Sequence, residues 1–84
     1  MMDCFITFRS VTFAQHGQRV LENVGIQCQI QRTPRWMEEQ GCGYCLRIHR
    51  GDALHAATVL RGKQVRFRKI YMTMADGSVE ESSI

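Results

Sequence analysis

The chain contains no long hydrophobic run, since no segment approaches the roughly 18 apolar residues that span a bilayer. It also has only one proline and seven glycines, too few for a collagen-like or a Pro/Gly-rich disordered chain. The start, Met1-Met2-Asp3-Cys4, lacks the basic and apolar regions of a secretory signal. These absences argue against membrane, fibrous and exported proteins, and they predict a cytoplasmic globular protein.

The composition that is present fits one small domain. A chain of 84 residues, 44% hydrophobic and 23% charged, can form one core but has no room for two. All 11 basic side chains lie in residues 1–75 with five acidic ones, whereas 76–84 is acidic and rich in serine. We therefore predict a basic domain over 1–75 and a flexible acidic tail over 76–84.

Hydrophobic periodicity predicts six elements. Alternating apolar and polar residues indicate strands at 4–8, 26–31, 44–49 and 65–74, and helical spacing indicates helices at 12–24 and 52–62. This order predicts an α+β protein with a single ferredoxin-like βαββαβ sandwich, in which two helices cover one face of a four-stranded antiparallel sheet. The fourth strand has no purely apolar face, so a β-bulge or register change is expected there.

The ends of the two helices carry recognisable signals. Thr12 and Asp52 are expected to cap the first turns, because their side-chain oxygens can accept from free backbone N–H groups. Gly25 and Gly62 are expected to end the helices, because glycine readily adopts the left-handed conformation found after a helix.

The four cysteines are expected to be free thiols, because disulfide scaffolds belong to secreted proteins. Cys4 and Cys28 share strand faces with isoleucine or phenylalanine, so both should be buried and inert. Cys42 precedes the third strand and Cys45 lies on its non-core face. The sequence therefore predicts that Cys42 and Cys45 are the accessible pair.

Residues 32–43 form a connection far longer than a hairpin needs, which is typical of a functional loop. The permanent cation of Arg35 and the unobstructed backbone at Gly41 and Gly43 would favour the thiolate of Cys42. Cys42 is thus the candidate nucleophile, with Cys45 and Arg35 beside it in the reactive set. An ordinary exposed thiol fits the same residues.

Further ligand-binding candidates surround this loop. Arg35, Trp36, Gly43, Arg47 and His49 come from the loop or from the non-core face of the third strand. Zinc needs four ligands, whereas only Cys42, Cys45 and His49 are near one another, so we predict neither a metal nor a cofactor. A tryptophan that only packs against the domain remains an alternative for Trp36.

Several short motifs make the chain resemble the small bacterial selenium/sulfur carrier-like domains. They are Ile6-Thr7-Phe8-Arg9-Ser10, Val24-Gly25-Ile26, Pro34-Arg35 and Cys42-Gly43, within residues 4–73. The resemblance implies a ferredoxin-like unit whose Cys42 carries sulfur or selenium as a persulfide or perselenide. Cys45 adds a second thiol that would let a loaded Cys42 discharge into a disulfide.

We therefore predict a thiol-based sulfur or selenium carrier, or a small redox adaptor, with donor and acceptor proteins as partners. A turnover enzyme is less expected, because no general base or phosphate loop accompanies the cysteines.

Two alternatives stay open. The basic and aromatic run Arg66–Tyr71, with Phe5 and Arg47, weakly resembles sheets that bind single-stranded RNA or another anion. Nucleic-acid binding is less expected than the carrier role, because the RNP1 signature is absent. The second alternative is an interaction module that forms a homodimer through its open sheet face.

Overall fold

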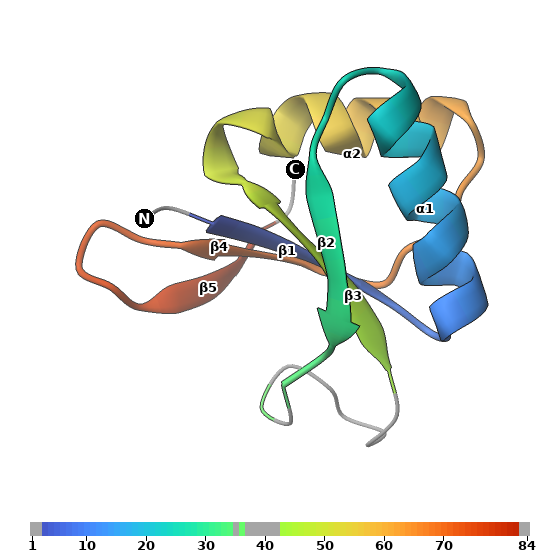
Figure 1. Ribbon diagram of the computed structural model, residues 1–84. Coiled ribbons are helices and arrows are strands. Elements are labelled where there is room, and N and C mark those ends of the chain that lie inside the picture. The colour runs from blue at the N-terminus through green and yellow to red at the C-terminus, as the bar shows by residue number, and fades with distance from the viewer. Residues whose placement is uncertain (1–2, 35, 37–42, 83–84) are drawn as a thin grey trace.

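The computed structural model describes residues 3–34, 36 and 43–82. Its elements, shown in Figure 1, are β1 (Asp3–Phe8), α1 (Val11–Asn23), β2 (Cys28–Arg32), β3 (Tyr44–His49), α2 (Ala53–Gly62), β4 (Ile70–Thr73) and β5 (Val79–Ser82), with a 3-10 turn at Arg50–Asp52 before α2. In this part of the chain, no helix has the length and apolar character needed to cross a membrane.

The protein is α+β, with a five-stranded antiparallel sheet in the order β2-β3-β1-β4-β5. The expected four-stranded ferredoxin-like layout is therefore matched only in part, because β5 extends the sheet beyond β4. This strand comes from the segment 76–84, for which we expected a flexible tail. Lys69 and Glu81 form an ion pair of 3.7 Å near this edge, and the β4–β5 hairpin projects to one side in Figure 1.

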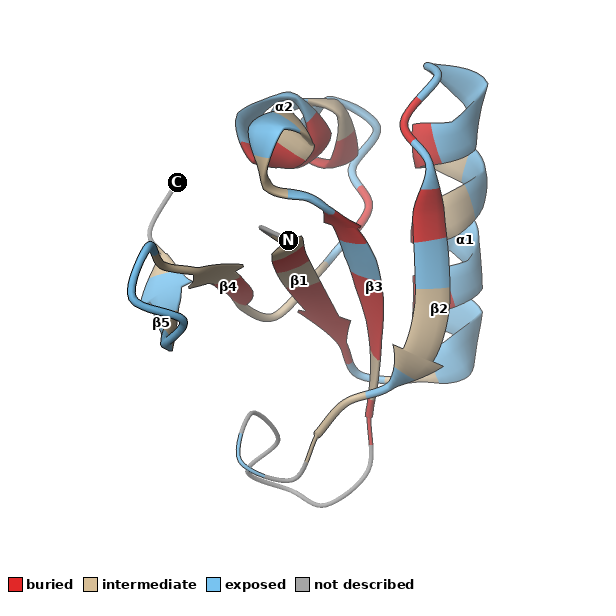
Figure 2. Ribbon diagram, turned by 60° about the vertical axis from the view of Figure 1, so that its left-hand side comes forward, coloured by how far each residue is buried: buried red, intermediate tan, exposed pale blue. Residues whose placement is uncertain are grey.

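The hydrophobic core lies between one face of the sheet and both helices. Its largest fully buried side chains are Phe8, Ile6, Leu21, Leu46 and Leu60. Figure 2 shows buried segments on the central strands β1 and β3 and on parts of α1 and α2. Gly17 lets α1 approach the sheet closely, because a Cβ there would lie 2.8 Å from Phe8 Cζ.

Both helices end in the same hydrogen-bonded motif. After α1, Gly25 has a φ of +85° and the Ile26 N–H donates to the Leu21 carbonyl over 3.0 Å. After α2, Gln64 has a φ of 60° and the Val65 N–H donates to the Leu60 carbonyl over 2.8 Å. Both ends are Schellman motifs, in which the left-handed residue lets the chain reverse and satisfy the last carbonyls.

Gly25 therefore follows the end of α1 as predicted, and α2 ends at Gly62 as predicted. The left-handed residue after α2 is Gln64, however, and the two N-cap predictions need correction. The cap of α1 is Ser10 instead of Thr12, and its hydroxyl accepts from Phe13 N over 3.4 Å. Asp52 stands at the cap position of α2 but accepts no backbone hydrogen bond through its side chain.

The expected irregularity before β4 is a β-bulge opposite Thr7. Thr7 N–H donates to the Lys69 carbonyl, while its own carbonyl accepts from Arg68 N, so two residues face one. Its hydroxyl also accepts from Lys69 N over 3.0 Å. The extra residue shifts the alternation, which allows Val65 before the bulge and Ile70 after it both to be buried in the core.

The two Schellman motifs predict opposite changes in stability when the left-handed residue is replaced, because one motif has glycine at that position and the other has glutamine. Gln64→Gly should stabilise the protein by roughly 0.5 to 1 kcal/mol, because the left-handed conformation strains any residue with a Cβ. Gly25→Ala should destabilise it by about 1 kcal/mol for the same reason. Urea unfolding of both variants measures the difference, and a destabilised Gln64→Gly would contradict it.

Candidate functional site

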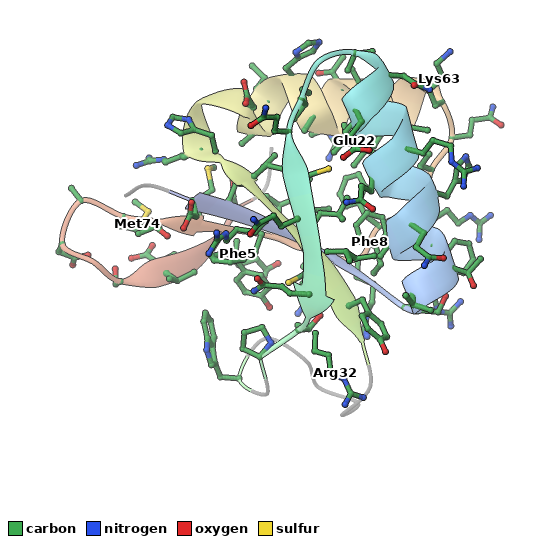
Figure 3. All side chains as sticks on the ribbon, viewed as in Figure 1. Phe5, Phe8, Glu22, Arg32, Lys63 and Met74 are labelled. Carbon is green, nitrogen blue, oxygen red and sulfur yellow. The ribbon has the colours of Figure 1, made fainter. Side chains whose placement is uncertain are left out.

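The cysteine-bearing loop begins and ends at one end of the β2–β3 pair. Thr33 N–H donates to the Gly43 carbonyl over 3.1 Å, which continues the pairing one step beyond the strands. Arg32 lies at this end of the sheet in Figure 3, with its guanidinium 5.8 Å from the Tyr44 ring centre. Gly43 is thus held in place, whereas the predicted site residues Arg35 and Cys42 lie outside the described residues.

Cys45 lies on the sheet face opposite the core, as the alternation of β3 predicted. Its register partners are Thr7 on β1 and Gln31 on β2, and its neighbour Leu46 points into the core. The prediction that Cys45 is accessible is wrong, because its exposed fraction is 0%. Cys45 is therefore a buried thiol on the face that lacks helices.

An aromatic contact joins the residues after β2 to this face of the sheet. The rings of Trp36 and Tyr71 meet edge-on, with 5.8 Å between their centres. Trp36 follows β2, whereas Tyr71 lies on β4, which β3 and β1 separate from β2 in the strand order. Trp36 itself stays 61% exposed, while Tyr71 is only 9% exposed. The tryptophan thus packs against the domain and still presents most of its surface.

Burial raises the pKa of the Cys45 thiol, because a thiolate loses its hydration there. The Thr33 and Gln31 side chains can donate to a thiolate at this position, which opposes that effect and lowers the pKa in part. The net direction is upward, so Cys45 is mainly protonated at neutral pH and reacts slowly as a nucleophile.

Cys4 and Cys28 are buried as predicted. Burial raises the pKa of Cys4 to about 12. It also raises the pKa of Cys28 to about 11, with a smaller contribution from the nearby charge of Glu22. Both thiols are therefore protonated and inert at neutral pH.

Arg47 and His49 lie farther along β3, away from Gly43. Arg47 Nη2 donates to Gln29 Oε1 over 2.9 Å, and His49 Nδ1 accepts from Gly51 N over 3.0 Å. Both line an open depression of about 710 Å³ together with Asp3, Glu22, Gln27, Gln29 and Asp52. The carboxylates among these residues make it a mixed-charge surface. The described candidates thus separate into Trp36, Gly43 and Cys45 at one end and this pair at the other.

The basic and aromatic segment before β4 does not form one open platform. Phe67 packs against the core and has the Arg61 guanidinium 5.4 Å from its ring centre. Phe5 lies on the opposite, open face of the sheet, level with Arg47 and Tyr71. The aromatic rings that would stack on bases are therefore on different sides.

Sequence analysis included Tyr71 in the basic and aromatic run of the sheet, and the structure places it on the open face level with Phe5. Sequence analysis did not identify Thr33, which lies next to Gly43 just after β2 and carries no comparable signal in the sequence. Within residues 3–34, 36 and 43–82, no group of three or more His, Cys, Asp or Glu side chains could hold a metal ion.

Comparison with models of protein families gives a match over most of the chain. The model of the family described as "Putative Se/S carrier protein-like" matches residues 3–72, which extend from β1 into β4. No curated protein and no solved structure matches the chain.

The burial of three thiols predicts a simple labelling pattern. In the folded protein at neutral pH, limiting iodoacetamide should modify Cys42 first, while Cys45 reacts much more slowly and Cys4 and Cys28 react only after unfolding. Peptide mass spectrometry after native and denaturing labelling measures the order. Rapid native labelling of Cys45 would contradict the burial that we describe.

Proposed function

The chain belongs to the Se/S carrier protein-like family, and on that premise we propose that it carries sulfur or selenium on Cys42, with Cys45 as the resolving thiol. The observation that carries this proposal is the environment of Cys45, a buried thiol three residues after Cys42 and two after the positioned Gly43. Because this thiol is close to Cys42 in the chain but buried from solvent, it suits a discharge step that follows the loading of Cys42. Partners would be a sulfur or selenium donor protein and an acceptor protein.

Loading requires a thiolate at Cys42. The Cys42 thiolate attacks the outer sulfur of a donor persulfide, R–S–SH, which forms Cys42–S–SH and releases the donor thiolate R–S⁻. No net oxidation or reduction occurs, because the sulfur moves between two equivalent thiols. Arg35 contributes a permanent positive charge close in sequence, which favours the thiolate and the anionic persulfide.

Discharge uses the second cysteine. The Cys45 thiolate attacks the Cys42 sulfur of Cys42–S–SH, forms the Cys42–Cys45 disulfide and expels HS⁻. The persulfide accepts two electrons from the two cysteines in this step. A cellular dithiol then supplies two electrons and two protons to restore both thiols.

The protonated state of Cys45 suits a carrier. A low-pKa thiol at this position would discharge a new persulfide at once, before an acceptor arrived. Burial raises the pKa of Cys45 and keeps its thiolate scarce at neutral pH. The loaded form can therefore persist until an acceptor binds or the face around Trp36 opens.

The exposed part of Trp36 provides a contact surface for such an acceptor, since a large aromatic side chain is a typical anchor in protein interfaces. A homodimer through the open sheet face remains a prediction. For single-stranded RNA, the inward position of Phe67 removes one of the rings on which that alternative depended.

Loading can be tested by intact mass spectrometry under non-reducing conditions. The protein is incubated with a cysteine desulfurase and cysteine, and separately with inorganic polysulfide, which needs no protein recognition. We expect one added sulfur on the wild type and none on Cys42→Ser. Cys45→Ser should load equally and keep the sulfur longer, because it cannot form the disulfide. Unchanged loading of Cys42→Ser would remove Cys42 from the carrier role.

Discharge should depend on pH in the direction set by Cys45. Below its raised pKa, the thiolate population increases about tenfold per pH unit, so sulfide release from loaded protein should accelerate as pH rises. Cys45→Ser, loaded in the same way, should lack this intramolecular acceleration. Sulfide release measured over a pH series at constant ionic strength tests this, and a flat wild-type profile would exclude Cys45 as the resolving thiol.

A further inference from the structure

The buried hydroxyl of Thr33 is unusual among the polar groups of this protein. Within the described residues, Thr33 Oγ1 is a buried side-chain oxygen without a hydrogen-bond partner. Leaving such a group unpaired in the folded protein costs free energy, so its retention needs a reason. A threonine at a sheet end could otherwise be replaced by valine with no loss of packing.

The strand register places this hydroxyl beside Cys45. Gln31 lies directly opposite Cys45, and the next pairing step joins Thr33 to Gly43. Side chains two residues apart on a strand share a face, so Gln31 and Thr33 both lie on the open face with the thiol. They bracket the Cys45 sulfur from the β2 side.

The opposite side of Cys45 offers no comparable donor. Thr7 on β1 is the register partner of Cys45. Its hydroxyl is already bonded to the Lys69 backbone: it donates to the Lys69 carbonyl over 3.3 Å and accepts from the Lys69 N–H over 3.0 Å. That hydroxyl maintains the β-bulge. Thr33 thus carries the uncommitted hydroxyl next to this thiol.

We propose that Thr33, with Gln31, is a positioning residue that donates a hydrogen bond to the Cys45 sulfur when that sulfur is a thiolate. A neutral thiol is a poor acceptor, which leaves the hydroxyl unpaired in the resting protein. A thiolate is a charged acceptor and forms a much stronger hydrogen bond. Ionisation of Cys45 therefore satisfies the hydroxyl and the sulfur in one step.

Two opposing effects then control when Cys45 reacts. Burial disfavours the thiolate and dominates, while the donors on β2 recover part of that loss. The consequence for sulfur discharge rests on the proposed function, since Thr33 would set the supply of the attacking thiolate. The hydrogen bond itself does not depend on any carrier role.

The test follows the ionisation of Cys45 directly. In a Cys42→Ser background with labelled cysteine, the carbon NMR shift of Cys45 Cβ is titrated against pH. Thr33→Val removes the hydroxyl at constant shape and should leave about tenfold less Cys45 thiolate at a given pH, the loss expected for one charge-assisted hydrogen bond. Thr33→Ser keeps the donor and should restore the wild-type titration.

Thr73→Val is the matched control, because Thr73 lies on the same face but on β4, paired with Val79. It should leave the Cys45 titration unchanged. Thr33→Val should also keep or increase the unfolding temperature, since it removes an unpaired buried hydroxyl. A purely structural threonine would instead lower this temperature without moving the titration.

An unchanged Cys45 titration in folded Thr33→Val would overturn the proposal, and so would a failure of Thr33→Ser to restore it. Neither result bears on sulfur loading at Cys42, which is measured separately. Conversely, a protein that never accepts sulfur would still show the titration difference. The two proposals therefore fail independently.

Discussion

The antiparallel pairing of β1 with β3 is the constraint on which the rest of the structure depends. This register brings Cys4 and Ile6 of β1 beside Ile48 and Leu46 of β3 on the core side. Because side chains alternate, a slip of one residue would move Leu46 to the open face and Cys45 into the core. Packing of the apolar face therefore keeps Cys45 on the face away from the helices. The same strand β3 begins directly after Gly43.

Burial determines the ionisation of the thiol that this pairing positions. Cys45 is fully buried although it lies on the face without helices, and Trp36 meets Tyr71 on that side of the sheet. In this setting the ionisation of Cys45 depends on a few side chains from β2, because water is no longer available to stabilise the charge. In the carrier role that we propose, the second thiol stays protonated and unreactive until its environment changes.

Much of the fold could be predicted because its elements rest on local patterns. The apolar alternation of residues 4–8 and 44–49 identifies strands, and Gly25 ends a helix wherever that helix lies. The irregular alternation around Arg68 and Lys69 was a visible sign of the bulge. The edge strand β5 was missed, because Val79–Ser82 is short, charged and only half-covered, as edge strands often are. Its pairing depends on the partner β4 and not on its own composition.

For the candidate site, too, local patterns predicted some features and tertiary contacts decided the others. The sequence by itself determined that Cys4 and Cys28 face the core and that Cys45 faces away from it, because strand alternation is a local property. Only the tertiary structure decided that Cys45 is buried and that Thr33 lies beside it with a free hydroxyl. Burial on the helix-free face comes from tertiary contacts that strand alternation does not encode, and pairing across the sheet brings Thr33 next to a residue 12 positions away. Contacts between segments distant in the chain leave no periodic trace in the sequence, so they appear only once the sheet is assembled.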